Sequence, residues 1–127
     1  MPNKGTEAHF WAAIRTHIPE AHWQRIESGL TAAGVPDVNG CYLGHEVWLE
    51  LKIVRGRRVH LTPNQTNWLV KRSTYGGHCF VVAQDIEGKI LLWSGRFARE
   101  VMEDGIRALG RIDIEDWDHL KKVIFNR

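Results

Sequence analysis

Residues 37–52 read DVNGCYLGHEVWLELK and predict two β-strands joined by a tight turn. We expect the first strand over about Asp37–Leu43, the turn at Gly44 and the second strand over His45–Lys52. Successive side chains of a strand point to opposite faces, so the second strand should present an apolar face and a mixed face. The apolar face comprises Val47, Leu49 and Leu51, and the mixed face comprises Trp48, Glu50 and Lys52.

The flanking sequence predicts helices on both sides of this hairpin. The elements expected before it are a helix over Glu7–Ile18 with Thr6 as N-cap, a strand over about His22–Glu27 and a loop over Ser28–Gly34. The elements expected after it are a basic loop over Arg55–Arg58, a helix over Thr62–Tyr75, strands over His78–Ala83 and Lys89–Trp93, and helices near Phe97–Gly105 and Glu115–Phe125.

This order of elements predicts an α/β fold of the α+β kind. A hairpin followed by a helical crossover to another strand implies a mixed central sheet covered by helices. The length of 127 residues fits one domain. We expect a core over about residues 6–93 and a C-terminal helical extension over about residues 94–127. Apolar residues of that extension can serve either the core or a dimer contact; they are Trp117, Leu120, Val123, Ile124 and Phe125.

Composition excludes several classes of protein. The sequence is 43% hydrophobic and 25% charged, as is usual for a globular domain, and no apolar run approaches the roughly 20 residues of a membrane helix. With no recognisable signal peptide we expect a cytoplasmic protein without membrane contacts. Cys41 and Cys79 are far apart and outside any C-x-x-C pair, which argues against structural zinc and favours buried free thiols.

Charge is distributed unevenly although the net charge is only +2. Basic residues gather after the second hairpin strand and on the following helix, at Arg55, Arg57, Arg58, Lys71 and Arg72. Acidic residues gather in the last third, at Glu100, Glu103, Asp104, Asp113, Glu115, Asp116 and Asp118. We expect one face that contacts a polyanion through its phosphates and another that faces water or a partner.

The hairpin carries the candidate catalytic and metal-binding residues. Glu50 and Lys52 share a strand face within an apolar run, where charges are unfavourable unless something compensates them. With Asp37 at the start of the first strand, two carboxylates converge, and a hard divalent cation such as Mg²⁺ or Mn²⁺ compensates such a pair. The alternative is an ordinary ion pair on a solvent face of the sheet.

Two further residues have a functional and a structural interpretation. Glu7 shares the helix stripe of Trp11 and Ile14, so it can face the site, or it can simply complement the helix dipole in the first turn. Gln65 can lie near the site, or it can close a capping box with Thr62. We expect these two roles of Gln65 to compete for one side chain.

Taken together, the motifs resemble the PD-(D/E)XK nuclease superfamily. They are Gly34-Val35-Pro36-Asp37, Glu50-Leu51-Lys52 and the helix start Leu61-Thr62-Pro63-Asn64-Gln65. The chain is most similar to small viral-type and archaeal-type members, which include Holliday-junction resolvases and virus-type replication-repair nuclease modules. The resemblance covers about residues 6–85 and implies a restriction-endonuclease-like core and one nuclease domain over residues 1–127.

The resemblance also implies roles for individual residues. Asp37 and Glu50 would bind Mg²⁺, or Mn²⁺ as a substitute, together with the backbone carbonyl of Leu51. Lys52 would orient or activate the attacking water. Glu7 would be a ligand directly or through water, and Gln65 would lie close to the site. Ser28 falls where some resolvases carry a loop serine near the scissile phosphate, although a plain loop serine is the simpler interpretation.

The function expected from this resemblance is a magnesium-dependent, structure-selective DNA endonuclease, specifically a resolvase of four-way or branched DNA. A resolvase needs two active sites on opposed strands, so we expect a homodimer and no small-molecule cofactor. One alternative is a general or flap nuclease of phage replication, repair or packaging, which would act in the bacterial host cytoplasm. Another is an inactive DNA-binding module with the nuclease fold, and a third is an interaction domain with a chance motif.

Overall fold

A computed structural model describes residues 5–26 and 33–125 of the chain. The helices are α1 (Glu7–His17), α2 (Pro63–Thr74), α3 (Ala98–Asp104) and α4 (Trp117–Phe125), with short 3-10 turns at Gly95–Phe97 and Gly105–Arg107. The strands are β1 (His22–Arg25), β2 (Val38–Tyr42), β3 (His45–Val54), β4 (Cys79–Asp85), β5 (Ile90–Ser94) and β6 (Ile112–Ile114). None of the helices in these residues is long and apolar enough to span a membrane.

The six strands form one mixed sheet in the order β1-β2-β3-β4-β5-β6. Only β3 and β4 are parallel, because α2 carries the chain from the end of one strand back to the start of the next. All other neighbours are antiparallel. The predicted mixed sheet is therefore confirmed. The three-residue strand β6 was missed, because a run this short has too little alternation to indicate a strand.

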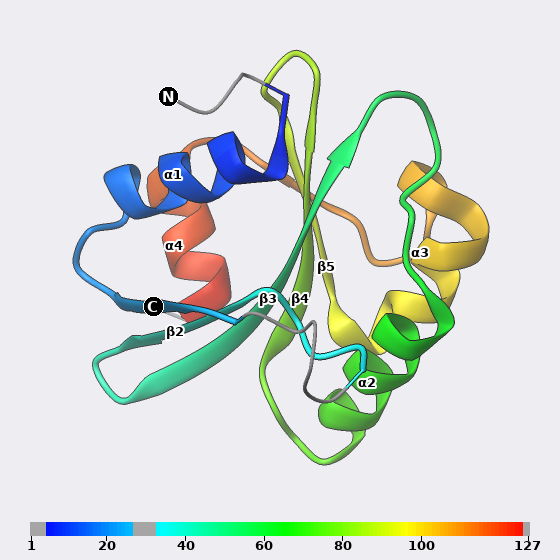
Figure 1. The fold of residues 1–127 in the computed structure, drawn as a ribbon, viewed down its shortest axis with the longest axis horizontal. Coiled ribbons are helices and arrows are strands. Elements are labelled where there is room, and N and C mark those ends of the chain that lie inside the picture. The colour runs from blue at the N-terminus through cyan, green and yellow to red at the C-terminus, as the bar shows by residue number, and fades with distance from the viewer. Residues whose placement is uncertain (1–4, 27–32, 126–127) are drawn as a thin grey trace.

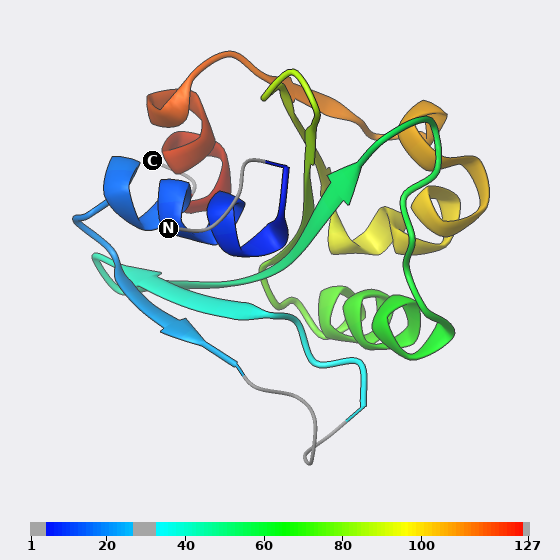
Figure 2. The ribbon, with the colours of Figure 1, turned by 45° about the horizontal axis from the view of Figure 1, so that its top comes forward.

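Helices cover both faces of the sheet. Figures 1 and 2 show α1 and α4 on one side and α2 and α3 on the other. Each pair of helices packs on its own cluster of buried side chains. The cluster under α1 and α4 includes Phe10, Ile14 and Leu49, and the cluster under α2 and α3 includes Leu69 and Trp93. The sheet thus separates two cores, and β3 contributes alternate side chains to each.

The alternation predicted for the second hairpin strand is present in β3. Val47, Leu49 and Leu51 are buried in the core under α1 and α4. On the opposite face, Trp48 packs against the core under α2 and α3, and Glu50 is also buried. The turn between the strands is Leu43-Gly44, and both residues have positive φ angles, 49° and 82°. This conformation suits a two-residue hairpin, because its twist matches that of the paired strands.

The C-terminal third is more than a helical extension. It adds β6 to the sheet, and α4 buries Leu120, Ile124 and Phe125 in the core under α1. Those three side chains therefore serve the core, which decides against their use in a dimer contact. Both cysteines are free, as predicted, but only Cys79 is buried, whereas Cys41 is half-buried on β2.

Candidate active site

The hairpin register brings Asp37 and Glu50 together. Val38 pairs with Leu49, so the register continued by one residue puts Asp37 opposite Glu50. Residues that lie directly opposite each other in an antiparallel pair have their side chains on one face, with Cβ atoms about 4.5–5.5 Å apart. Two carboxylates from different strands therefore meet on the face of the sheet that α2 covers.

Pro36 explains why the paired strands end at this point. Continued by one more residue, the register puts Pro36 opposite Leu51, and proline has no N–H to donate to a ladder. The Leu51 N–H instead donates to Oδ2 of Asp37 at 3.0 Å. The N–H and C=O of one strand residue point to the same side, so the Leu51 carbonyl points toward the same open edge of β3. A backbone oxygen is thus available beside the two carboxylates.

Gly34 fixes the segment that carries Asp37 against the start of α2. Its φ angle is +84°, and a Cβ added there would lie 2.2 Å from the backbone oxygen of Asn64. Only glycine satisfies both the backbone conformation and this close approach. The Gly34–Asp37 segment is therefore packed directly onto the helix terminus that carries Gln65.

Glu50 is the buried acid of the site. Its side chain is 2% exposed, and Oε1 receives no hydrogen bond from the described residues. Burial, the largest cause, and the neighbouring Asp37 carboxylate together raise the pKa of Glu50 to about 9, and the nearby Lys52 ammonium offsets only part of this rise. A carboxylate is retained in such a place only with a proton or a cation to balance it.

Lys52 and Gln65 complete a hydrogen-bonded network around Glu50. The Lys52 ammonium donates to Oε1 of Gln65 at 3.1 Å and lies 3.7 Å from Oε2 of Glu50. The amide of Gln65 donates from Nε2 to the same Oε2 of Glu50 at 3.3 Å. Gln65 therefore ties α2 to both charged residues of β3.

The same Gln65 also closes the capping box of α2. Its Oε1 accepts from the Thr62 N–H at 3.0 Å, and its own N–H donates to the Thr62 hydroxyl at 3.1 Å. The expected competition between cap and site is wrong. An amide oxygen has two lone pairs, which serve Thr62 and Lys52, while its NH₂ group serves Glu50.

Glu7 approaches the site from α1, on the opposite layer. Thr6 caps this helix by accepting from the His9 N–H, as predicted. Although Glu7 as a residue is exposed, partial burial of its carboxyl raises its pKa, and the Asp37 carboxylate adds to this. The Lys52 and Arg25 cations oppose the shift. Glu7 thus belongs to the same electrostatic cluster as Asp37 and Lys52.

The donor set fits a hard divalent cation held mainly by two carboxylates. Within residues 5–26 and 33–125, no group of three or more His, Cys, Asp and Glu side chains is arranged to hold a metal ion. The fit rests instead on Asp37, on the unpartnered Oε1 of Glu50 and on the Leu51 carbonyl. Oxygen ligands of this number suit Mg²⁺ or Mn²⁺, which usually keep several waters. Glu7 would then contact the cation through a water molecule.

The predicted basic residues lie in two places. Arg55, Arg57 and Arg58 are exposed on the loop after β3, and together with Ile53 and His60 they line a pocket of about 360 Å³. Arg55 also donates to the backbone oxygen of Gly5 at 2.8 Å, which ties this loop to the start of α1. Ser28, the other predicted contact, falls outside the residues that the structure describes.

Lys71 and Arg72 lie at the other end of α2, where sequence reasoning missed an aromatic partner. The Arg72 guanidinium stacks on Trp68 at 4.4 Å and lies 5.8 Å from the ring of Trp48. Trp68 and Arg72 are four residues apart, a spacing that puts side chains together on a helix and could have indicated the pair. Their contact with Trp48 depends on how α2 packs on β3, so no sequence pattern reveals it.

Comparison with known proteins supports the fold. Neither a family model nor a curated protein sequence matches the chain. Among solved structures, the chain is similar to Hjc, a Holliday junction resolvase from the hyperthermophilic archaeon Archaeoglobus fulgidus. The match has a TM-score of 0.59 and 12% sequence identity, and it covers 94% of this chain and 91% of that one. The expected resemblance to resolvases and the α+β fold class are thereby confirmed at the level of the fold.

Proposed function

We propose that this protein is a magnesium-dependent, structure-selective DNA endonuclease that resolves four-way or branched DNA. The observation that carries the proposal is Glu50, which is buried beside Asp37 and Lys52 and whose Oε1 receives no hydrogen bond from the described residues. Most buried side-chain oxygens have a hydrogen-bond partner, so a buried carboxylate with an open oxygen beside a second carboxylate calls for a cation or a proton. The resolvase-like fold supports the same activity class.

The residues of the site have distinct roles in phosphodiester hydrolysis. Asp37, Glu50 and the Leu51 carbonyl would hold Mg²⁺ or Mn²⁺. When bound, the cation supplies positive charge for the phosphate and acidifies the attacking water. Lys52 donates to the water or to the phosphate, and its ammonium is held in place by Gln65. Glu7 accepts a proton or a water hydrogen bond at the edge of the site.

The basic loop after β3 would position the DNA backbone. Arg57 and Arg58 are exposed next to the strand that carries Glu50 and Lys52, so they can contact phosphates on either side of the reacting one. Arg55 would contribute from the same loop. Because a four-way junction is cut on two opposed strands, the proposal includes a two-fold dimer with one such site on each subunit.

A cleavage assay tests both levels of the proposal. The wild-type chain and Glu50→Gln are incubated with a four-way junction and with a linear duplex of matched sequence, each with Mg²⁺ or with EDTA. We expect paired cuts near the branch point, only with wild type and Mg²⁺. Equal rates on junction and duplex would reduce the function to a general nuclease. Cleavage by Glu50→Gln at the wild-type rate would overturn the assignment of the site.

A further inference from the structure

The C-terminal end of α2 carries an exposed platform of aromatic and cationic side chains. A pocket of about 400 Å³ is lined there by Trp68, Lys71, Arg72 and Tyr75. Tyr75 is 81% exposed, which is unusual for a large aromatic side chain. The Arg72 guanidinium lies 4.4 Å from the centre of the Trp68 ring, and Arg72 as a residue is exposed.

This platform lies on the same side of α2 as Gln65, which belongs to the candidate active site. Gln65, Trp68, Arg72 and Tyr75 follow one another at intervals of three, four and three residues, which places them along one side of α2. At about 1.5 Å per residue, roughly 15 Å of helix separates Gln65 from Tyr75. That length corresponds to about four nucleotides at 3.4 Å per nucleotide. Trp48 precedes Glu50 on the same face of β3 and underlies Arg72.

The chemistry of the platform favours one occupant. Flat aromatic rings and guanidinium groups are the groups on which unpaired bases stack, and Lys71 and Arg72 supply charge for the adjoining phosphates. Helix α2 contains no acidic residue that would repel a polyanion. A paired duplex hides its base faces, so only a nucleotide released from stacking can use such a platform.

We infer that this platform of Trp68, Lys71, Arg72 and Tyr75 binds an unpaired nucleotide of the DNA strand, a few nucleotides from the cleaved phosphate. The inference rests on the proposed function for the identity of the nucleic acid. It supplies a physical basis for preferring branched DNA, because bases beside a branch point can leave the stack more readily than bases within a duplex. Lys71 contacts the phosphate next to the stacked base.

Binding of a short single strand tests this inference without cleavage. Fluorescein-labelled oligothymidine is titrated with the full chain in EDTA, and anisotropy gives the dissociation constant for wild type, Tyr75→Ala and Tyr75→Phe. We expect Tyr75→Ala to weaken binding roughly fivefold to 100-fold, because stacking of one base contributes on that scale. Tyr75→Phe should bind like wild type, since it retains the ring. Leu109→Ala, at a residue that is 71% exposed elsewhere, is the matched control.

The outcomes separate this inference from the proposed function. If wild type and Tyr75→Ala bind oligothymidine equally, the platform is not a base-binding site, whatever the junction assay gives. If binding depends on Tyr75 but no junction is cut with Mg²⁺, the platform stands and the nuclease assignment fails. A fall from dimer to monomer in Tyr75→Ala, measured by analytical ultracentrifugation, would instead make this face a subunit contact and overturn the inference.

Discussion

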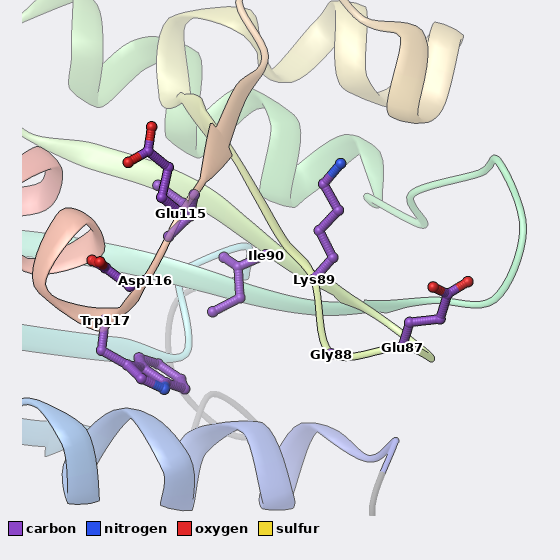
Figure 3. Close-up of a pocket in the computed structure, with 8 residues that line it drawn as sticks. Glu87, Gly88, Lys89, Ile90, Glu115, Asp116 and Trp117 are labelled. Carbon is purple, nitrogen blue, oxygen red and sulfur yellow. The ribbon is translucent and has the colours of Figure 1, made fainter.

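Two regions of the molecule are rich in carboxylates, and they differ in how those carboxylates are satisfied. In the candidate active site, Glu50 is buried, and one of its oxygens has no hydrogen-bond donor within residues 5–26 and 33–125. The second region is a pocket of about 540 Å³ between the β4–β5 turn and the start of α4 (Figure 3). The acidic residues that line it are Glu87, Glu115 and Asp116, and all are exposed.

Two acids, one in this second pocket and one beside it, have their own partners. Asp116 caps α4 by accepting from the His119 N–H at 2.7 Å. Nearby, Asp113 binds Arg111 at 2.7 Å and Lys89 at 3.2 Å. Burial alone would raise the pKa of Asp113, but hydrogen bonds from Arg111 and Lys89 outweigh it and lower the pKa. The difference between the two regions is that Glu50 is buried beside a second carboxylate, whereas Asp113 and Asp116 are exposed and have donors.

The largest expected effect separates the two regions by activity. Glu50→Gln should lower Mg²⁺-dependent junction cleavage on the order of 1000-fold, because a metal ligand contributes several kcal/mol to the transition state. Asp113→Asn, in the second region, should leave the rate within about twofold, as expected for a surface ion pair. Single-turnover rates measure both. If Asp113→Asn lowered the cleavage rate as much as Glu50→Gln, the assignment of catalysis to the Glu50 site would be contradicted.

A smaller effect distinguishes the two roles of Gln65. Gln65→Ala removes the cap of α2 and also the hydrogen bonds to Lys52 and Glu50, so activity should fall roughly 10–100-fold, as for other groups that orient metal ligands. Thr62→Ala and Asp116→Ala remove helix caps alone and should each lower stability by about 1 kcal/mol. Cleavage rates and urea unfolding are measured on all three variants. If Thr62→Ala loses as much activity as Gln65→Ala, the loss of the α2 cap alone explains the effect of substituting Gln65.

Two glycines with similar backbone angles test how tightly each region is packed. Gly34 and Gly88 have φ angles of +84° and +91°, but only at Gly34 would a Cβ collide with backbone, that of Asn64. Gly88→Ala should lower the free energy of unfolding by about 1–2 kcal/mol from backbone strain alone. Gly34→Ala should exceed that value, because the segment must also move away from α2. Equal destabilisation in urea unfolding would show that the close approach is unimportant.

The two regions should also differ in the pH dependence of stability, measured in EDTA. Because the pKa of Glu50 rises from 4.5 to about 9 on folding, the folded state binds its proton more tightly. This contribution is therefore full below about pH 4.5 and is lost as pH rises toward 9. Asp113 has a lowered pKa, so its contribution has the opposite sign and is lost in acid. Urea midpoints from pH 3 to 9 check both trends.

Two substitutions test which carboxyl group causes each of these pH trends. Glu50→Gln should remove the decline of stability above about pH 4.5, because the amide does not ionise. Asp113→Asn should leave that decline intact and reduce only the loss of stability in acid. If wild type and Glu50→Gln have parallel pH profiles, Glu50 is not the buried acid that the structure describes.

Local patterns predicted the elements that support the site. Alternation along residues 45–52 indicated which face of β3 is apolar, and the capping residues Thr62 and Gln65 marked the start of α2 within one residue. These features depend on neighbours in sequence, so they can be read without a fold. Local patterns do not predict strand β6 or the place of the C-terminal segment in the core, because both depend on contacts with β5 and α1.

Which groups are present, and which of them share a strand face or a helix side, can be read from the amino-acid order, since those relations follow from backbone periodicity. Three features of the site appear only in the folded chain: Glu50 is buried with one oxygen unpartnered among the described residues, Gln65 both caps α2 and binds Glu50, and Arg72 lies near the Trp48 ring. Each of these depends on packing between elements that are distant in the chain. That packing sets burial, electrostatics and side-chain contacts, and no local sequence pattern contains it.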